Sequence, residues 1–140
     1  MKLPSAERAL LSAAKKARER AYAPYSRFKV GAAVLLASGD TTTGVNVENC
    51  SFGLTVCAER NAVAAAVREG ARPGDVVAVA IVARAHRLTP PCGACRQVLV
   101  EFCRPGARVL MHNLENGRTA VMTIDTLLPQ AFRPDNMRKS

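Results

Sequence analysis

Apolar residues recur at helical spacing in three stretches of the chain. The first predicted helix begins beside Ser5, a good N-cap residue, and should end near Tyr22 because Pro24 cannot continue it. Alanine-rich or mixed apolar patterns of the same period predict two further helices, over residues 57–70 and 92–103. A glycine at the end of the second helix is a typical C-terminal cap.

Shorter apolar runs predict strands between these helices. Two of them flank Gly39, which predicts a β-hairpin. Residues 76–83 are apolar at every position, which predicts a central strand covered on both faces. The expected strands cover residues 27–37, 41–47, 76–83, 107–112 and 118–124. This order of elements predicts one mixed sheet flanked by helices, an α/β or α+β layer architecture.

The 140 residues are predicted to form a single domain, residues 1–140, because 49% of them are apolar and no linker or repeat interrupts the pattern. No run approaches the roughly 18 to 20 apolar residues that a membrane span needs, and the first ten residues lack the apolar core of a signal peptide. We therefore expect a soluble cytoplasmic protein without a membrane partner.

The net charge of +9 does not change the expectation of a soluble protein. Such a charge attracts nucleic acids and other anions at long range. However, the basic residues are scattered, and aromatic residues, on which unpaired bases would stack, make up only 4% of the chain. The charge therefore predicts a solvated basic surface and no nucleic-acid partner.

The five cysteines point to a metal or a catalytic role, since an odd number does not form a fully paired disulfide framework. Cys92 and Cys95 have the C-x-x-C spacing, which suits either a metal or a redox disulfide. The metal interpretation takes Cys57 as a third ligand. Cys103 lies too far along the helix, about 12 Å from Cys95, while the spacing leaves Cys50 open. Three thiolates leave one position for water, as in catalytic zinc sites, whereas four would make a structural site.

Glu59 and two arginines accompany these cysteines. On a regular helix, positions 57 and 59 point to opposite sides, so Cys57 and Glu59 should have different roles. The carboxylate of Glu59 suits a proton carrier above the open metal position, although a glutamate at a helix start is also favoured by the helix dipole alone. Arg60 and Arg96 each directly follow a motif residue and could offset thiolate charge; for Arg96, an exposed charge on the helix is the equal alternative.

The chain resembles the small cytidine deaminases of nucleoside salvage, with cysteine as the first zinc ligand. The resemblance is carried by C-A-E and, 35 residues later, P-C-x-x-C, together with "AYAPYSRFKVGAA", "NVEN", "PCGACRQVLVEF" and "LLPQAF". It implies a three-layer α-β-α fold with a five-stranded mixed sheet and one Zn²⁺ per chain. It also implies a hydrolase that converts cytidine and 2′-deoxycytidine to the uridine nucleosides and ammonia, with Glu59 carrying protons from the zinc-bound water to the base.

The same resemblance implies roles for substrate-binding residues. Asn46 and Glu48 would hold ribose hydroxyls, Phe28 would line the nucleoside pocket, and the backbone at Ala58 would read the base. Phe132 would reach the base of a neighbouring subunit, which implies a homotetramer with shared sites.

Two positions depart from the family, and three other functions stay open. Phe52 stands where family members usually have tyrosine, and Pro90 where they usually have serine. A blasticidin S deaminase would share the metal motif, although the "LLPQAF" ending is more typical of the cytidine enzymes. A polynucleotide cytidine deaminase would need a segment to hold flanking nucleotides, and a structural zinc module would need Cys50 or another fourth ligand.

Overall fold

Five strands form one mixed sheet in the computed structural model, which describes residues 2–139. Their order across the sheet is β2-β1-β3-β4-β5, with β3 and β4 parallel and the other neighbours antiparallel. The strands are β1 (Val30–Leu36), β2 (Thr41–Val45), β3 (Val76–Ala83), β4 (Cys103–Asn113) and β5 (Thr119–Thr123). The predicted mixed five-stranded sheet, the hairpin and the bounds of the central strand are confirmed.

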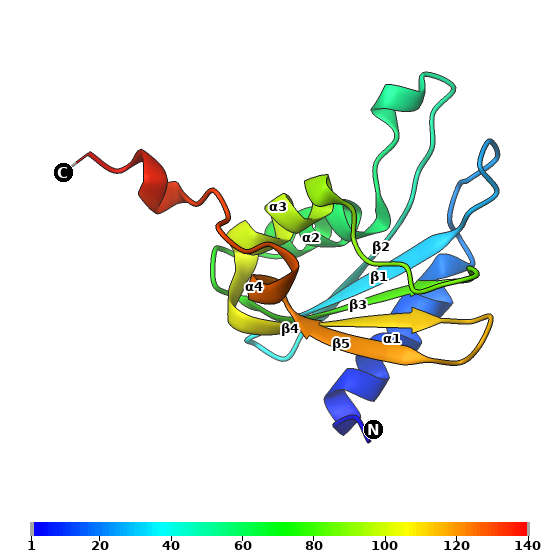
Figure 1. Ribbon diagram of the computed structural model, residues 1–140, viewed down its shortest axis with the longest axis horizontal. Helices are drawn as coiled ribbons and strands as arrows, with labels where there is room; N and C mark the ends of the chain where they lie inside the picture. Colours follow the sequence, from blue (N-terminus) through cyan, green and yellow to red (C-terminus); the bar gives the residue numbers. More distant parts are fainter. Residues whose placement is uncertain (1, 140) are drawn as a thin grey trace.

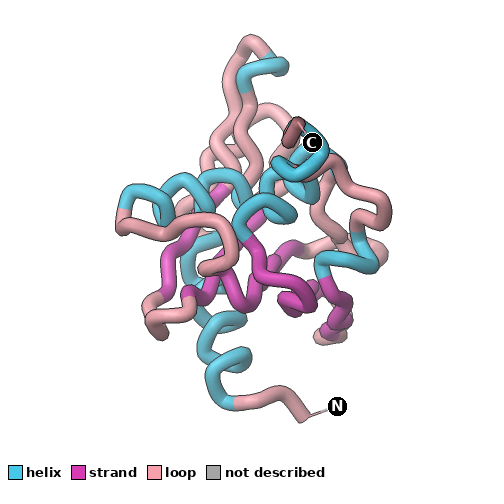
Figure 2. The backbone as a smooth tube through the Cα atoms, turned by 90° about the vertical axis from the view of Figure 1, so that its left-hand side faces the viewer, coloured by secondary structure: helices cyan, strands magenta, loops and turns pink. Residues whose placement is uncertain are grey.

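Helices cover both faces of the sheet (Figures 1 and 2). One face carries α1 (Ser5–Arg18), and the other carries α2 (Ala58–Arg68), α3 (Gly93–Phe102) and the short α4 (Ile124–Leu127). Two 3₁₀ turns, η1 (Phe52–Leu54) and η2 (Pro134–Met137), complete the elements. The expected capping role of Ser5 is wrong, because Ser5 is already helical and Pro4 holds the N-cap position. No helix within residues 2–139 is long and apolar enough to cross a membrane.

The two faces of β3 explain its uninterrupted apolar sequence. Val79 and Ile81 belong to the core beneath α2 and α3, whereas Ala80 and Val82 belong to the core beneath α1. Side chains alternate across a strand with a period of two, so a strand covered on both sides needs an apolar residue at each position. The prediction of a doubly covered central strand is therefore confirmed.

The end of α1 was predicted wrongly. The helix ends at Arg18, and Tyr22 lies in extended backbone that pairs with the segment after β2. Its N–H donates to the Asn46 carbonyl at 3.0 Å, and its carbonyl accepts from the Glu48 N–H at 2.9 Å. These long-range hydrogen bonds, rather than Pro24, end the helix several residues early.

Three chain segments meet at one end of the sheet, and this meeting point positions the site. Val30 at the start of β1 pairs with Ala83 at the end of β3, and Gly31 pairs with the last residue of β2. The loops that enter or leave these strands are therefore neighbours. Gly44 lets α2 approach β2 closely, because a side chain there would collide with backbone atoms at Ala58 and Ala62. The N-terminus of α2 is thereby held against the sheet beside these loops.

Candidate active site

Three cysteine sulfurs gather at the N-termini of α2 and α3. The Sγ atoms of Cys57 and Cys92 lie 3.9 Å apart, and those of Cys57, Cys92 and Cys95 all lie within 4.8 Å of one another. Three sulfurs bound tetrahedrally to zinc, each about 2.3 Å from the ion, are separated by about 3.8 Å. The cluster therefore fits a zinc ion, and no other group of His, Cys, Asp or Glu side chains in residues 2–139 gathers in this way.

Both helices begin at a ligand cysteine. Cys57 and Cys92 are the N-cap residues of α2 and α3, with extended backbone, and Cys95 is the third residue of α3. The Cys95 N–H donates to the Cys92 sulfur at 3.5 Å. Helix N-termini favour anionic sulfur through their free N–H groups and the helix dipole. Because Cys57 precedes the helix, the expected opposition of positions 57 and 59 on a helical wheel does not apply to it.

The thiols of Cys57 and Cys95 differ in how readily they lose a proton. The pKa of Cys57 falls to about 5, first because the Cys95 thiol donates a hydrogen bond to it and also because of Arg60. The Arg60 Nη2 donates to the Cys57 sulfur at 3.5 Å. The pKa of Cys95 rises, because its proton is held by Cys57 and its side chain is buried. Of these two sulfurs, Cys57 more readily carries negative charge, and Arg60 lies where it offsets that charge.

Glu59 is buried beside the sulfurs, with only 5% of its surface exposed. It lines the same pocket as Cys57 and Cys92 without belonging to the sulfur cluster. Burial raises the pKa of Glu59 to about 7. A carboxyl group of this kind can both accept and donate a proton near neutral pH.

The pocket above the cluster has a volume of about 240 Å³ and opens to solvent. Its walls come from four segments of the chain and consist of Ser26, Phe28, Val30, Asn46, Glu48, Thr55, Cys57, Ala58, Glu59, Thr89, Pro90 and Cys92. It brings together the sequence-predicted residues Phe28, Asn46, Glu48 and Ala58 with Cys57, Cys92 and Glu59. A second cavity of about 350 Å³ adjoins it, since Ser26, Glu48 and Thr55 line both.

Asn46 and Glu48 also have a structural task that the sequence did not reveal. The Asn46 side chain accepts from the Val30 N–H at 2.9 Å and donates to the Phe28 carbonyl at 2.7 Å. The Glu48 carboxylate accepts hydrogen bonds from the turn at Ser26. Sequence reasoning missed Ser26, because a serine in a loop carries no signal of its partner 22 residues away.

Phe132 does not enter the pocket of its own chain. Its side chain is 59% exposed, and the Gln97 Nε2 donates to its carbonyl at 2.8 Å. The terminal segment that carries it extends away from the body of the molecule (Figure 1).

Arg96 contacts no thiolate and is not a free surface charge either. Its Nε donates to the Pro91 carbonyl and its Nη1 to the Leu127 carbonyl, both at 2.8 Å. Both alternatives considered for Arg96 are therefore wrong, and its observed contacts connect the start of α3 to α4.

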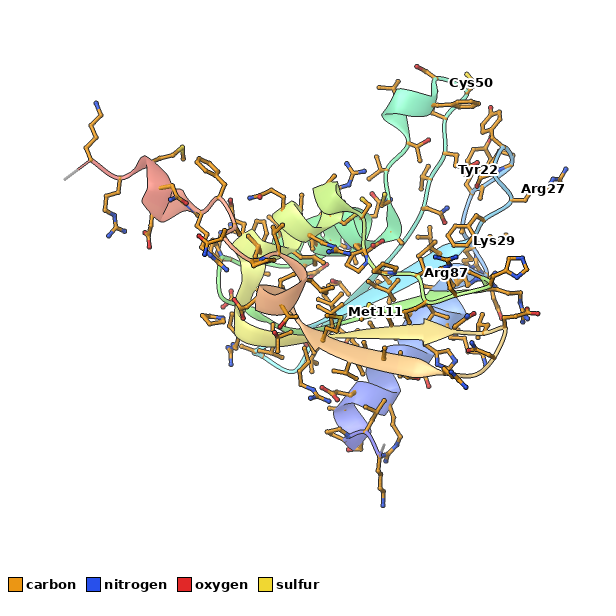
Figure 3. All side chains as sticks on the ribbon, in the orientation of Figure 1. Tyr22, Arg27, Lys29, Cys50, Arg87 and Met111 are labelled. Atoms are coloured by element: carbon orange, nitrogen blue, oxygen red, sulfur yellow. The ribbon has the colours of Figure 1, made fainter. Side chains whose placement is uncertain are left out.

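The remaining cysteines lie outside the cluster. Cys103 is buried at the junction of α3 and β4, where burial raises the pKa of its thiol to about 12. Cys50 is exposed at the tip of the loop that carries η1 (Figure 3).

Phe52 in the same loop is 72% exposed and packs against the Tyr25 ring with centroids 5.7 Å apart.

A sheet covered by helices on both faces, with three thiols at two helix N-termini and a buried carboxyl group that lines the same pocket, fits the site of a metal-dependent hydrolase. The family model of the cytidine and deoxycytidylate deaminase zinc-binding region matches residues 4–112. The chain belongs to this family.

Individual relatives agree with the family match. A cytidine deaminase of Halalkalibacterium halodurans is 51% identical over 128 residues, which cover 91% of this chain and 95% of the relative. A cytidine deaminase of Sporosarcina psychrophila is 44% identical over 91% of this chain and 92% of its own length. The crystal structure of cytidine deaminase from Burkholderia pseudomallei superimposes with a TM-score of 0.85 at 50% identity, covering 89% of this chain and 98% of that one.

Proposed function

We propose that this protein is a zinc-dependent cytidine deaminase of pyrimidine salvage. It hydrolyses cytidine and 2′-deoxycytidine to uridine and 2′-deoxyuridine and releases ammonia. One observation carries the proposal. Cys57, Cys92 and Glu59 line one pocket, and the Cys95 sulfur lies in the same cluster, although these residues come from the starts of two separate helices. The relatives named above, which are cytidine deaminases, support the same substrate.

Cys57, Cys92 and Cys95 would hold the metal, and the spacing of their sulfurs fits one zinc ion per chain. Zinc in such a site supplies a Lewis acid that makes water a nucleophile at neutral pH. Three thiolates would leave the site with a net negative charge, which opposes ionisation of that water. The Arg60 guanidinium, which donates to the Cys57 sulfur, offsets this charge.

Glu59 moves the protons of the reaction. It takes one proton from the attacking water and gives it to N3 of cytosine. It then takes the second proton from the hydroxyl group added at C4 and gives it to the amine, which leaves as ammonia while the C4 carbonyl forms. Its burial suits this role, because few water molecules compete for the transferred proton. The backbone at Ala58, directly before Glu59 in the chain, binds the polar edge of the base.

The other end of the pocket holds the sugar. Phe28 forms an apolar wall, and Asn46 and Glu48 bind ribose hydroxyls. An amide can donate and accept hydrogen bonds, and a carboxylate can accept them, so both can pair with hydroxyl groups.

Two measurements test the proposal: a comparison of possible substrates, and the activity and zinc content of a Glu59→Ala variant. Cytidine, 2′-deoxycytidine, blasticidin S, cytosine and single-stranded DNA are supplied in parallel, and ammonia release and bound zinc are measured. We expect turnover of the two nucleosides only. Glu59→Ala should keep one zinc per chain and lose nearly all turnover, whereas Glu69→Ala, which changes an exposed glutamate at the end of the same helix, should retain both. Failure of the wild-type protein on both nucleosides would refute the proposal.

We also propose that four chains assemble with shared sites, in the cytoplasm. Several large apolar side chains at the sugar end of the pocket and on the terminal segment are exposed, and a partner chain would cover them: Tyr22, Tyr25, Phe28, Phe52, Leu54 and Phe132. Phe132 would complete the pocket of a neighbouring chain. Light scattering should give four times the mass of one chain; a monomer with full activity would contradict the shared site.

A further inference from the structure

The carboxylate of Glu48 is almost fully engaged by one turn of its own chain. Its Oε1 accepts from the Tyr25 N–H at 2.9 Å and from the Ser26 N–H at 3.1 Å. Its Oε2 accepts from the Ser26 hydroxyl. A carboxylate has about four lone-pair positions. One position therefore remains, on Oε2, and the Ser26 hydroxyl occupies the other position on that same oxygen.

The hydrogen of the Ser26 hydroxyl is directed toward Glu48 by a second contact. The Phe28 N–H donates to the Ser26 Oγ at 3.0 Å, so that oxygen acts there as an acceptor and its own hydrogen is free to donate to Oε2. Ser26 thus connects the carboxylate of Glu48 to the backbone of Phe28, and all three residues line the pocket above the sulfurs. A hydrogen bond to an ionised carboxylate is among the stronger ones in proteins.

The turn between Ser26 and Phe28 has a strained backbone, and its hydrogen bonds to Glu48 offset the cost of that strain. Arg27 has φ of 58°, in the left-handed region that residues other than glycine rarely adopt, and its side chain points away from the body of the molecule (Figure 3). The backbone on the far side of the turn is held separately by Asn46, which contacts Phe28 and Val30. Removal of the Ser26 hydroxyl therefore frees only Oε2 of Glu48, while the backbone contacts on Oε1 and the Asn46 contacts persist.

We propose that Ser26 is a positioning residue for sugar recognition: its hydroxyl orients the Glu48 carboxylate so that the remaining lone pair of Oε2 accepts a hydroxyl of the nucleoside sugar. This inference rests on the proposed function, because it assumes that a nucleoside occupies the pocket. Ser26 does not touch the reacting atoms of the base in this arrangement. The effect of a Ser26 substitution on activity should therefore depend on whether the substrate has the 2′- and 3′-hydroxyls of the sugar.

The experiment compares Ser26→Ala with wild type on cytidine and on 2′,3′-dideoxycytidine, which lacks the 2′- and 3′-hydroxyls and keeps the 5′-hydroxyl. We expect kcat/KM for cytidine to fall about 10- to 100-fold, mainly through KM. For the dideoxy substrate, the variant should stay within about twofold of wild type, because neither enzyme can use the Glu48 contact. Ser26→Thr, which keeps the hydroxyl, should recover most of the cytidine activity.

Ser38→Ala is a matched control, because Ser38 also donates to a carboxylate, that of Asp40, and accepts from a backbone N–H, but in the distant β1–β2 hairpin. It should leave both substrates unchanged. If Ser26→Ala folds poorly, Ser26→Cys keeps the volume with a weaker donor and should show the same substrate-dependent loss.

Two results would overturn the inference: an equal loss on both substrates, which indicates a purely structural role, or unchanged cytidine kinetics in Ser26→Ala. A wild-type protein inactive on every nucleoside would instead refute the proposed function itself, and this inference with it.

Discussion

The two ends of the pocket are built in opposite ways. At the sulfur end, Ala58, Glu59 and Cys95 are at most 5% exposed and lie in the first turns of helices packed on the sheet, and of the three cysteines only the N-cap residues Cys57 and Cys92 line the open pocket. At the sugar end, Tyr25 and Phe52 are 49% and 72% exposed and lie in loops. In the proposed function, the chemistry thus falls to helices packed on the sheet, and the sugar contacts fall to loops that hydrogen bonds hold together.

The difference follows from what each end must do. Metal ligands and a proton carrier work only within narrow geometric limits, and helices on a packed sheet keep such limits well. Sugar recognition needs a few polar groups at an open rim, which loops can supply. A single chain therefore completes the sulfur end, while the exposed aromatic side chains at the sugar end suit contact with a second chain.

The largest effect is expected at the sulfur end. Cys95→Ala should abolish zinc binding and reduce activity more than about a thousandfold, because one of three ligands is lost. Cys103→Ala, at another buried cysteine only eight residues along the chain, should keep one zinc per chain. Zinc content by atomic absorption checks both. Zinc retained at full stoichiometry in Cys95→Ala would show that the cluster is not the metal site.

A smaller loss is expected from the residue that offsets charge at the same end. Arg60→Gln removes the cation beside the Cys57 sulfur and should weaken zinc binding about 10- to 100-fold, as is typical of groups that support metal ligands. Competition with a chelator measures this affinity. Arg68→Gln, at an exposed arginine of the same helix, is the control. Equal zinc affinity in the two variants would remove Arg60 from the site.

At the sugar end, Phe132→Ala should lower kcat/KM for cytidine about tenfold through loss of stacking on the base. The decisive measurement mixes this variant with Glu59→Ala during co-expression. If each site takes Glu59 from one chain and Phe132 from another, about a quarter of the sites in an equal, random mixture are fully wild type. Activity above the sum of the two separate variants supports shared sites, whereas simple addition would show that each chain works alone.

The sequence predicts features that depend on neighbouring residues better than features that depend on residues far apart in the chain. The C-x-x-C of Cys92 and Cys95 and the fully apolar β3 are local patterns, so both could be predicted from the chain alone, whereas Cys57, 35 residues before Cys92, was added as a third ligand because a metal site needs more than two. The early end of α1 and the contact between Ser26 and Glu48 depend on residues more than 20 positions apart, which no local pattern encodes. Asn46 was predicted as a sugar ligand, but its backbone contacts appear only in the folded chain.

The smallest effect concerns the two cysteines outside the cluster: Cys50 in the exposed loop beside the sugar end, and Cys103 in the core at the C-terminal end of α3. In the zinc-loaded enzyme at pH 8, iodoacetamide should modify exposed Cys50 first and leave activity on cytidine nearly unchanged. Because burial raises the pKa of Cys103 to about 12, only about one molecule in ten thousand carries its thiolate at pH 8. Its modification should therefore be slow and should accelerate about tenfold per pH unit below that pKa. Mass spectrometry of the modified peptides follows both sites. Equal rates at Cys50 and Cys103 would mean that the core at the junction of α3 and β4 opens to the reagent as readily as the exposed loop that carries η1.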